Sequence, residues 1–487
     1  MGAARAIGST AITAFLAFSG CGDPSSQLDS PPSSDAGQPP DTVTPDAGMP
    51  GDAQPEPDAD ADDGCPSLFS QDELPEWHVT LSDQEWAALE DEFYNRLARE
   101  AAGLDRNPYH PVEDITYDDG SGPVHVPGVL IRLKGQSSWV HAVLYDENPK
   151  MQFVIAFNEV DSDKRFKGVR KVELDMPRTD WTYLRHRLAL HTMRKVGQDA
   201  QCANNAMLYI NGEYYGLFTH VERIDKEFLQ RIYGKVNGAD DGDLWKSGSR
   251  IETNEDNYSE DRIDALWSAT SSVELGALAD LDDAVHEWAA EAILPHADGY
   301  HIGRHNYFLY DHPHRGFLWL PSDLDTAFDF YPHDLDVAFP QCVARDYRHW
   351  GPYATVLGDP AWMAEYIAAI TEARQFYDPD EQVALVEEWT NQIASAALAD
   401  PRRPFTIDDH TWALGQLREH LYLRDDFIGD WLTCRQNGTG QDWDQDGTVF
   451  CFDCDDKNSA VHPAQTETCN GVDDDCDGFV DEGLQCP

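Results

Sequence analysis

The pattern of apolar and polar positions predicts a mixed α/β region followed by a mostly helical one. In the first region, alternating segments predict strands at 77–80, 122–134, 153–157, 169–174, 206–210 and 214–221. Helical spacing in the same region predicts helices at 82–102, 183–196 and 225–233. In the second region, we expect a hairpin at 307–320 and helices at 260–275, 280–297, 358–376, 380–399 and 408–433. This order predicts a two-lobed α/β (α+β) fold.

The amino-terminal end predicts export. Residues 1–21 contain Arg5, a short apolar run and small residues that lead to Cys21, which resembles a bacterial lipoprotein signal. Lipidation at Cys21 and simple cleavage for secretion are the two alternatives. Residues 22–64 are rich in Pro, Ser and Asp and carry no Lys or Arg, so we expect a disordered acidic linker. We therefore expect an outer-membrane or cell-surface lipoprotein, or a secreted protein, that contacts a membrane only through an N-terminal lipid anchor.

The net charge of the chain excludes some classes of binding partner. The 487 residues include 35 Lys and Arg against 89 Asp and Glu, for a net charge of -54. Nucleic-acid binding needs clustered basic residues that neutralise phosphates, so we expect no nucleic-acid partner. Apolar residues make up 41% of the chain, which is enough to build a substantial core between the two ends.

The cysteines point to disulfides. The chain has ten, and most of them follow residue 433. Cys451 and Cys454 form a C-x-x-C pair for which zinc binding and redox chemistry are alternatives. We favour structural disulfides, because export exposes thiols to oxidation and the neighbours of this pair are carboxylates. The connectivity does not follow from the sequence.

Two segments near the carboxyl end share the spacing D-x-D-x-D-G. They consist of Asp442, Asp444 and Asp446, and, later in the chain, of Asp473, Asp475 and Asp477. Alternating carboxylates on a tight loop bring together the hard oxygen ligands that Ca²⁺ prefers, and the glycine permits the turn. Asp453 is placed to close the first loop, and Asp481 or Glu482 the second. We therefore predict a Ca²⁺-binding, disulfide-linked unit at 436–487, against the alternative of a solvated acidic tail. It resembles thrombospondin type 3 repeats and metal-binding tails of the MopE type.

Three polar clusters lie between the N-terminal linker and the C-terminal tail. The first is a Gly/Ser turn after Lys134, with Ser137 and Ser138 beside it, whose N–H and hydroxyl groups are suited to a phosphate. Lys150, at the start of a predicted strand, is within reach of the same anion. A common structural turn is the alternative.

The second and third clusters are acidic. Glu222 ends an apolar strand, where a lysine such as Lys150 would balance its charge, and a solvated strand end is the alternative. In the third cluster, Asp298 follows a predicted helix and Asn306 precedes the hairpin, while Asp323 and Asp325 follow it. Asp, Asn and Asp on short loops are the side chains that metal-assisted phosphoryl transfer uses, and ordinary turns are the alternative.

Six stretches in this region resemble the CotH family of spore-coat kinases, which have an atypical protein-kinase-like fold. They are IRLKGQSS (131–138), PKMQFVIAF (149–157), FKGVRKVEL (166–174), LYINGEYYGLFTHVERID (208–225), GDLWKSG (242–248) and WLPSDLDTAF (319–328). The resemblance covers roughly residues 75 to 435, so we expect the kinase-like domain at 65–435. It departs from the family at Ser322, where Trp is frequent, and at Asp329, where the family has Gly.

The resemblance implies a role for each polar residue. Asp298 would be the catalytic base, and Asn306 and Asp323 would hold Mg²⁺ or Mn²⁺, with Asp325 as an alternative or second ligand. Lys150 would contact the α- and β-phosphates of ATP in an ion pair with Glu222. The remaining nucleotide-binding candidates are Lys134, Ser137, Ser138 and, more weakly, Lys246.

These observations favour one function over two alternatives. The leading interpretation is an exported protein kinase that moves the ATP γ-phosphoryl group to Ser or Thr of an exported or surface protein. The second is a non-catalytic surface, coat or adhesion protein with a kinase-like scaffold and a calcium-binding tail. The third is another nucleotide transfer, such as adenylylation, on the same scaffold.

Overall fold

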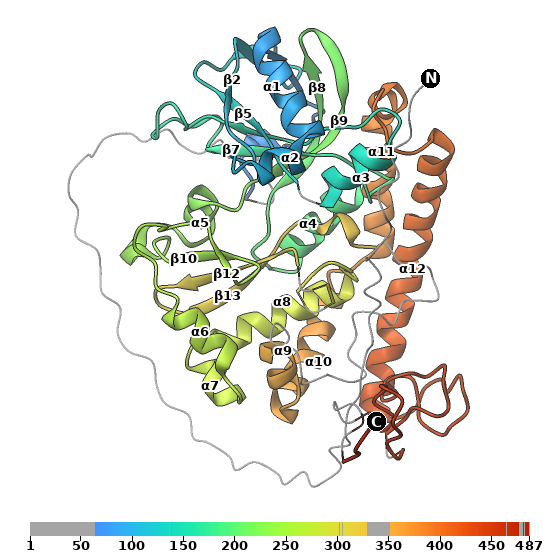
Figure 1. The fold of residues 1–487 in the computed structure, drawn as a ribbon. Coiled ribbons are helices and arrows are strands. Elements are labelled where there is room, and N and C mark those ends of the chain that lie inside the picture. Colours follow the sequence, from blue (N-terminus) through green and yellow to red (C-terminus); the bar gives the residue numbers. More distant parts are fainter. Residues whose placement is uncertain are drawn as a thin grey trace, which may run out of the picture.

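The computed structural model describes residues 64–487, with gaps at 136, 301, 304, 329–350, 464, 477–480, 482 and 487. The side chains of residues 137, 138, 141 and 145 are also outside the description. The described chain forms two lobes, each built on its own sheet, and a disulfide-rich tail (Figure 1). The prediction of a two-lobed mixed α/β fold is therefore confirmed.

The amino-terminal lobe is built on a nine-stranded sheet of order β2-β5-β6-β7-β9-β8-β1-β3-β4. Its strands are β1 Glu76–Thr80, β2 His110–Pro111, β3 Asp114–Asp118, β4 Val124–His125, β5 Leu130–Leu133, β6 Phe153–Ala156, β7 Lys171–Asp175, β8 Ala203–Ile210 and β9 Glu213–Glu222. The β8–β9 hairpin turns at Asn211 and Gly212, which both have positive φ (52° and 82°), as the Asn-Gly pair predicts. This hairpin places the far end of β9 beside β7 in the middle of the sheet.

Four helices accompany this sheet. They are α1 Asp83–Tyr94, α2 Arg96–Ala101, α3 Ser137–Tyr145 and α4 Arg185–Lys195. Ser82 caps α1 by accepting a hydrogen bond from the Glu85 N–H. The helix α4 lies between the two lobes and packs against β8 on one side and the turn η3 (Leu324–Thr326) on the other (Figure 1). It thereby links the central sheet to the loops of the second lobe.

The carboxyl-terminal lobe combines a small antiparallel sheet with helices. The sheet has the order β11-β10-β12-β13, with β10 Asp243–Lys246, β11 Arg250–Ile251, β12 Tyr307–His312 and β13 Gly316–Pro321. The helices are α5 Lys226–Tyr233, α6 Asp261–Ser268, α7 Ser272–Gly276, α8 Leu281–Ile293, α9 Gly351–Leu357, α10 Pro360–Arg374, α11 Pro379–Ala399 and α12 Ile407–Asn437. Trp288 of α8 and Trp319 of β13 meet at a ring distance of 5.3 Å, so this helix is fixed against the hairpin by a fully buried aromatic core.

The longest helix, α12, extends from beside the amino-terminal lobe to the tail (Figure 1). It starts with a capping box in which Thr406 and Asp409 each satisfy a backbone N–H of the other. It ends at Gly438 in the left-handed conformation (φ 63°). Among the described helices, none is both long enough and apolar enough to cross a membrane.

Several predicted elements are divided or shortened in the structure, among them the expected helix at 260–275, which is divided into α6 and α7. The expected strand at 122–134 is divided between β4 and β5, because Pro127 lacks an N–H and Gly128 has a φ of 70°. The expected helix at 82–102 is interrupted at Asn95, whose side chain donates to Asp91 at 2.8 Å. The expected helix at 280–297 ends at Ile293, since Pro295 disfavours helical geometry in the residue before it.

Candidate active site

The first group of predicted site residues converges because of the β12–β13 hairpin. Tyr307 pairs with Pro321 at its open end, so the residues just before β12 and just after β13 are neighbours. Asn306 and Asp323 occupy these positions, and both have left-handed backbone conformation (φ 47° and 55°). Asn and Asp tolerate this conformation better than most residues. The hairpin therefore places the two predicted metal ligands side by side.

Asp298 joins this pair from the loop that follows α8. The Asn306 amide donates to Asp298 Oδ2 at 3.4 Å and to the Asp323 carbonyl at 3.3 Å. The Asp298 N–H donates to Thr326 Oγ1 at 3.2 Å. A Cβ on Gly303 would lie 2.5 Å from Asp298 Cα, so only glycine lets the loop turn this closely. The structure thus brings together Asp298, Asn306 and Asp323.

A buried histidine supports the same loop. His296 makes hydrogen bonds through Nδ1 with Glu291 Oε1 at 3.1 Å and through Nε2 with the Asp323 carbonyl at 3.3 Å. One imidazole therefore links α8, through Glu291, to the backbone of the Asp323 loop. This contact orients the loop and leaves the Asp323 carboxylate exposed.

Lys134 approaches these loops from the amino-terminal lobe. It follows β5 and donates from Nζ to Glu173 and Asp175, two carboxylates on one face of β7. Burial alone would lower the pKa of Lys134, but the charges of Asp175 and Glu173 outweigh it and raise the pKa. Asp323 contributes to the same shift, which places Lys134 near the hairpin loop.

The carboxylates around Lys134 have opposite pKa shifts. Burial raises the pKa of Asp175 to about 7, although Lys134 opposes the shift. The pKa of Glu173 is lowered, because Lys134 and Arg223 together outweigh the cost of its burial. Lys246 lies close to Glu173, and burial lowers the pKa of its amine. The site is therefore a network of opposite charges, in which Lys246 lies near the other candidate residues.

Two residues that sequence reasoning missed lie next to Asp323. Ligand atoms of Asp175, His186 and Asp323 are all within 4.8 Å of one another, a grouping suited to a metal ion. His186 is in the first turn of α4, and burial lowers its pKa to about 4. The sequence did hold a signal for β7: Lys171, Glu173 and Asp175 alternate with Val172 and Leu174, so the three charged residues share a face. Nothing in the sequence connected His186 to them.

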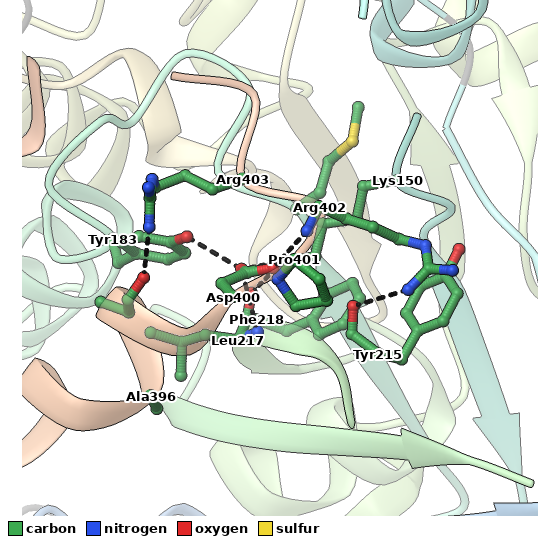
Figure 2. Close-up of polar contacts among 12 residues, drawn as sticks. Lys150, Tyr183, Tyr215, Leu217, Phe218, Ala396, Asp400, Pro401, Arg402 and Arg403 are labelled. Carbon is green, nitrogen blue, oxygen red and sulfur yellow. Dashed lines mark hydrogen bonds and ion pairs between the residues drawn. The ribbon is translucent and has the colours of Figure 1, made fainter. Parts of the chain in front are cut away.

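The predicted pairing of Lys150 with Glu222 is wrong. Lys150 is fully buried, and its Nζ donates to Asp400 Oδ2 at 2.7 Å and to the Leu217 carbonyl (Figure 2). It lies 4.2 Å from the centre of the Phe218 ring. Asp400 also accepts from the Tyr183 hydroxyl at 2.9 Å. These contacts enclose the amine, which has no exposed surface to offer to a phosphate.

Glu222 has a different partner as well. Its Oε2 accepts from the guanidinium of Arg231, on α5, at 2.6 Å, and its Oε1 accepts at 2.9 Å. The Cys202 N–H donates to Glu222 at 3.0 Å. Glu222 therefore joins β9 to α5 and to the start of β8, and it stays away from Lys150.

The remaining predicted nucleotide- and metal-binding residues do not all join the candidate site. Ser137 and Ser138 begin α3 instead of lying in a turn between strands, and their side chains are outside the described residues. Asp325, in η3, accepts a hydrogen bond from Thr179 Oγ1 and is not among the three converging ligands. Burial and then the charge of Asp323 raise the pKa of Asp325.

The tail brings five carboxylates together. Asp442, Asp444 and Asp456 form one group of converging oxygens, and Asp444, Asp446 and Asp453 form another that shares Asp444. Each of the five has one buried oxygen without a hydrogen-bond partner among the described residues. Burial, together with neighbouring carboxylates, raises the pKa of Asp453 to about 7 and that of Asp456 to about 6. Sequence reasoning found four of these residues and missed Asp456.

The second tail loop has a smaller group. Oxygens of Glu467, Asp473 and Asp475 converge, and Glu467 is an addition to the predicted ligands. Asp481 instead accepts from the N–H groups of Asn470 and Gly471. Asp477 is outside the described residues.

Disulfides hold the tail, as predicted. The bonds are Cys434–Cys451, Cys454–Cys476 and Cys469–Cys486, with Cys65–Cys202 in the amino-terminal lobe. The two cysteines of the C-x-x-C pair therefore bond to different partners, which excludes them as a redox pair or as zinc ligands. Cys434 is on α12, so the first bond fixes the tail to the end of this helix.

Comparison with known proteins agrees with these features. The family model for the CotH kinase protein matches residues 131–428, which is more than half of the chain. A model for a metal-binding motif, named for copper binding in MopE, matches residues 453–482 in the tail. A search of curated proteins finds no match to this chain. The length of the first match shows the family, and the chain belongs to the CotH kinase family.

Proposed function

We propose that the chain is an exported phosphotransferase that moves the γ-phosphoryl group of ATP to Ser or Thr of an exported or surface protein. The observation that carries the proposal is the convergence of Asp298, Asn306 and Asp323 at the open end of the β12–β13 hairpin, opposite Lys134. Phosphoryl transfer depends mainly on positioning and on charge stabilisation, and this set supplies both. Export is supported by the signal-like residues 1–21.

Each residue has a distinct role in the proposal. Asp298 accepts the proton of the acceptor hydroxyl, and the Asn306 amide orients its carboxylate. Lys134 contributes positive charge toward the nucleotide phosphates and is held in place by Glu173 and Asp175. Asp323 binds a divalent ion, Mg²⁺ or Mn²⁺. Such an ion neutralises charge on the phosphates when it is bound.

A transfer assay with the full exported chain tests the proposal. The chain is incubated with Mg²⁺ or Mn²⁺ and with ATP labelled at either the γ- or the α-phosphate, using dephosphorylated casein as a general Ser/Thr acceptor, while calorimetry measures ATP binding. We expect γ-label on protein with wild type, its loss in Asp298→Ala and Asp323→Ala, and its retention in Asp264→Asn, an exposed surface control on α6. Transfer of α-label instead would replace phosphorylation with nucleotide transfer.

Absence of ATP binding with either ion would overturn the proposal. The kinase-like lobes would then be a non-catalytic scaffold for surface or coat assembly. Thermal unfolding of each variant separates lost chemistry from lost folding.

A second function of the tail has its own support. We propose that residues 436–487 bind Ca²⁺ through Asp442, Asp444, Asp446, Asp453 and Asp456, whose five unpartnered buried oxygens would otherwise be costly. Carboxylate oxygens suit Ca²⁺ better than copper, which prefers nitrogen and sulfur ligands. Calorimetry with Ca²⁺ and Cu²⁺ tests this choice. We expect Asp444→Asn, which affects both groups, to abolish Ca²⁺ binding and Asp455→Asn, an exposed neighbour, to leave it unchanged.

A further inference from the structure

The imidazole of His186 is buried beside the carboxylates of Asp175 and Asp323. The residue is only 2% exposed, and its Nε2 is buried without a hydrogen-bond partner among the described residues. Leaving such a group unpaired inside a protein destabilises the fold. Its Nδ1 is 4.0 Å from Asp175 Oδ2, too far for a hydrogen bond. The ring therefore has lone-pair capacity that the protein does not use.

The neighbours of this ring are carboxylates on two other elements. Asp175 is at the end of β7, and Asp323 follows β13. Ligand atoms of the three side chains are within 4.8 Å of one another. Bonds of about 2.1 Å allow two ligands of one ion to be up to about 4.2 Å apart. Movements of a few tenths of an ångström would therefore bring all three onto one cation.

Rigid elements hold these ligands in place. His186 is near the start of α4, where Thr182 Oγ1 accepts from the N–H groups of Leu184 and Arg185. One oxygen of Asp175 is occupied by Lys134, which leaves Oδ2 on the His186 side. Partners of this kind orient a ligand and increase metal affinity.

From this geometry we propose that His186, Asp175 and Asp323 form a metal site that selects Mn²⁺ over Mg²⁺ and fills before the nucleotide arrives. Mg²⁺ takes oxygen ligands and relies on substrate phosphates, whereas imidazole suits transition metals. Three ligands from the protein itself are enough to hold the ion without ATP. The inference deepens the proposed function, because it names the ion of the same site.

The test is electron paramagnetic resonance of Mn²⁺ added to the full chain without nucleotide, with excess Ca²⁺ present to occupy the tail. We expect a ¹⁴N coupling from direct imidazole ligation. In His186→Asn we expect this coupling to disappear and the Mn²⁺ affinity to fall by about 10-fold or more. His191→Asn is the matched control, since this imidazole is on the same helix but faces the Trp389 ring at 5.9 Å.

A third variant tests the choice of ion. His186→Asp makes the site all-oxygen, and we expect it to shift preference toward Mg²⁺. Wild type that binds Mn²⁺ without ¹⁴N coupling, or binds both ions equally, would overturn the inference even if phosphate transfer occurs. Coupling without any ATP binding or transfer would leave the metal site in place and overturn the proposed function.

Discussion

The clusters around Lys134 and Lys150 differ in the number of their acidic partners and in their exposure. Lys134 keeps 18% of its side-chain surface and faces two carboxylates directly, with Asp323 close by. Lys150 keeps no surface and has one acidic partner, Asp400. A buried lysine with a single matched acid is fully neutralised. Around Lys134, Arg223 also pairs with Glu173 and Lys246 lies close by, so several acids and bases share the charge.

The difference assigns Lys150 to the packing of the two lobes and Lys134 to the candidate active site. Lys150 precedes β6, donates a hydrogen bond to the Leu217 carbonyl of β9, and pairs with Asp400 between α11 and α12. It therefore joins the two lobes. Gly216 permits this approach, since a Cβ there would lie 2.6 Å from Asp400 Oδ1 and 2.8 Å from Lys150 Nζ.

The largest expected effect is on the Lys150 pair. Lys150→Met leaves the buried Asp400 carboxylate without its ion-pair partner, so we expect the free energy of unfolding to fall by about 3–5 kcal/mol. Chemical denaturation measures it. Replacing both residues, with Lys150→Met and Asp400→Leu, should recover most of the loss, because no charge is left buried. Lys171→Met, which breaks a partly exposed pair with Glu159, is the control and should cost about 1 kcal/mol or less.

One result would contradict the comparison directly. If Lys150→Met leaves stability unchanged and abolishes ATP binding, Lys150 acts on the nucleotide and the two lysines exchange roles.

The next effect concerns Lys134. Lys134→Met removes a positive charge from the candidate site, and we expect phosphate transfer to fall about 10²–10³-fold, equivalent to about 2.7–4 kcal/mol. Initial rates at saturating ATP measure the change. Lys134→Arg keeps the charge and should retain part of the activity. Equal rates in wild type and Lys134→Met would show that Lys134 takes no part in phosphate transfer.

A smaller effect is expected at Gly216. Gly216→Ala forces a methyl group into the Lys150–Asp400 contact at a φ of 150°, so we expect a loss of about 1–3 kcal/mol in unfolding free energy. Gly212→Ala, in the turn of the same hairpin, is the control: it adds backbone strain at a positive φ but no crowding, because nothing lies within 4 Å of its Cβ position. A similar loss in both variants would mean that the approach to Lys150 does not matter.

The smallest effect tests what holds the Asp400 loop. Thr406→Ala removes half of the capping box that starts α12 directly after this loop, and we expect a loss of about 1 kcal/mol. If the helix start positions Asp400, combining Thr406→Ala with Lys150→Met should cost less than the sum of the two. Thermal unfolding of the single and double variants measures the coupling, and full additivity would show that Asp400 is positioned independently.

The sequence alone determined the features that depend on neighbours along the chain. The Asn211-Gly212 turn and the spacing of the tail carboxylates are local, and each was visible as a pattern. The convergence of Asn306 and Asp323 also followed from one predicted hairpin. Local geometry has few alternatives, so residue type and spacing suffice.

Only the tertiary structure decided the partners of the buried charges. Lys150 and Asp400 are 250 positions apart, and His186 meets Asp323 from another element. A lysine before an apolar strand has many carboxylates within possible reach in a chain this acidic, and family resemblance selected the wrong one. Which acid it meets depends on how the lobes dock, because the cost of burying a charge is offset only by a partner at contact distance.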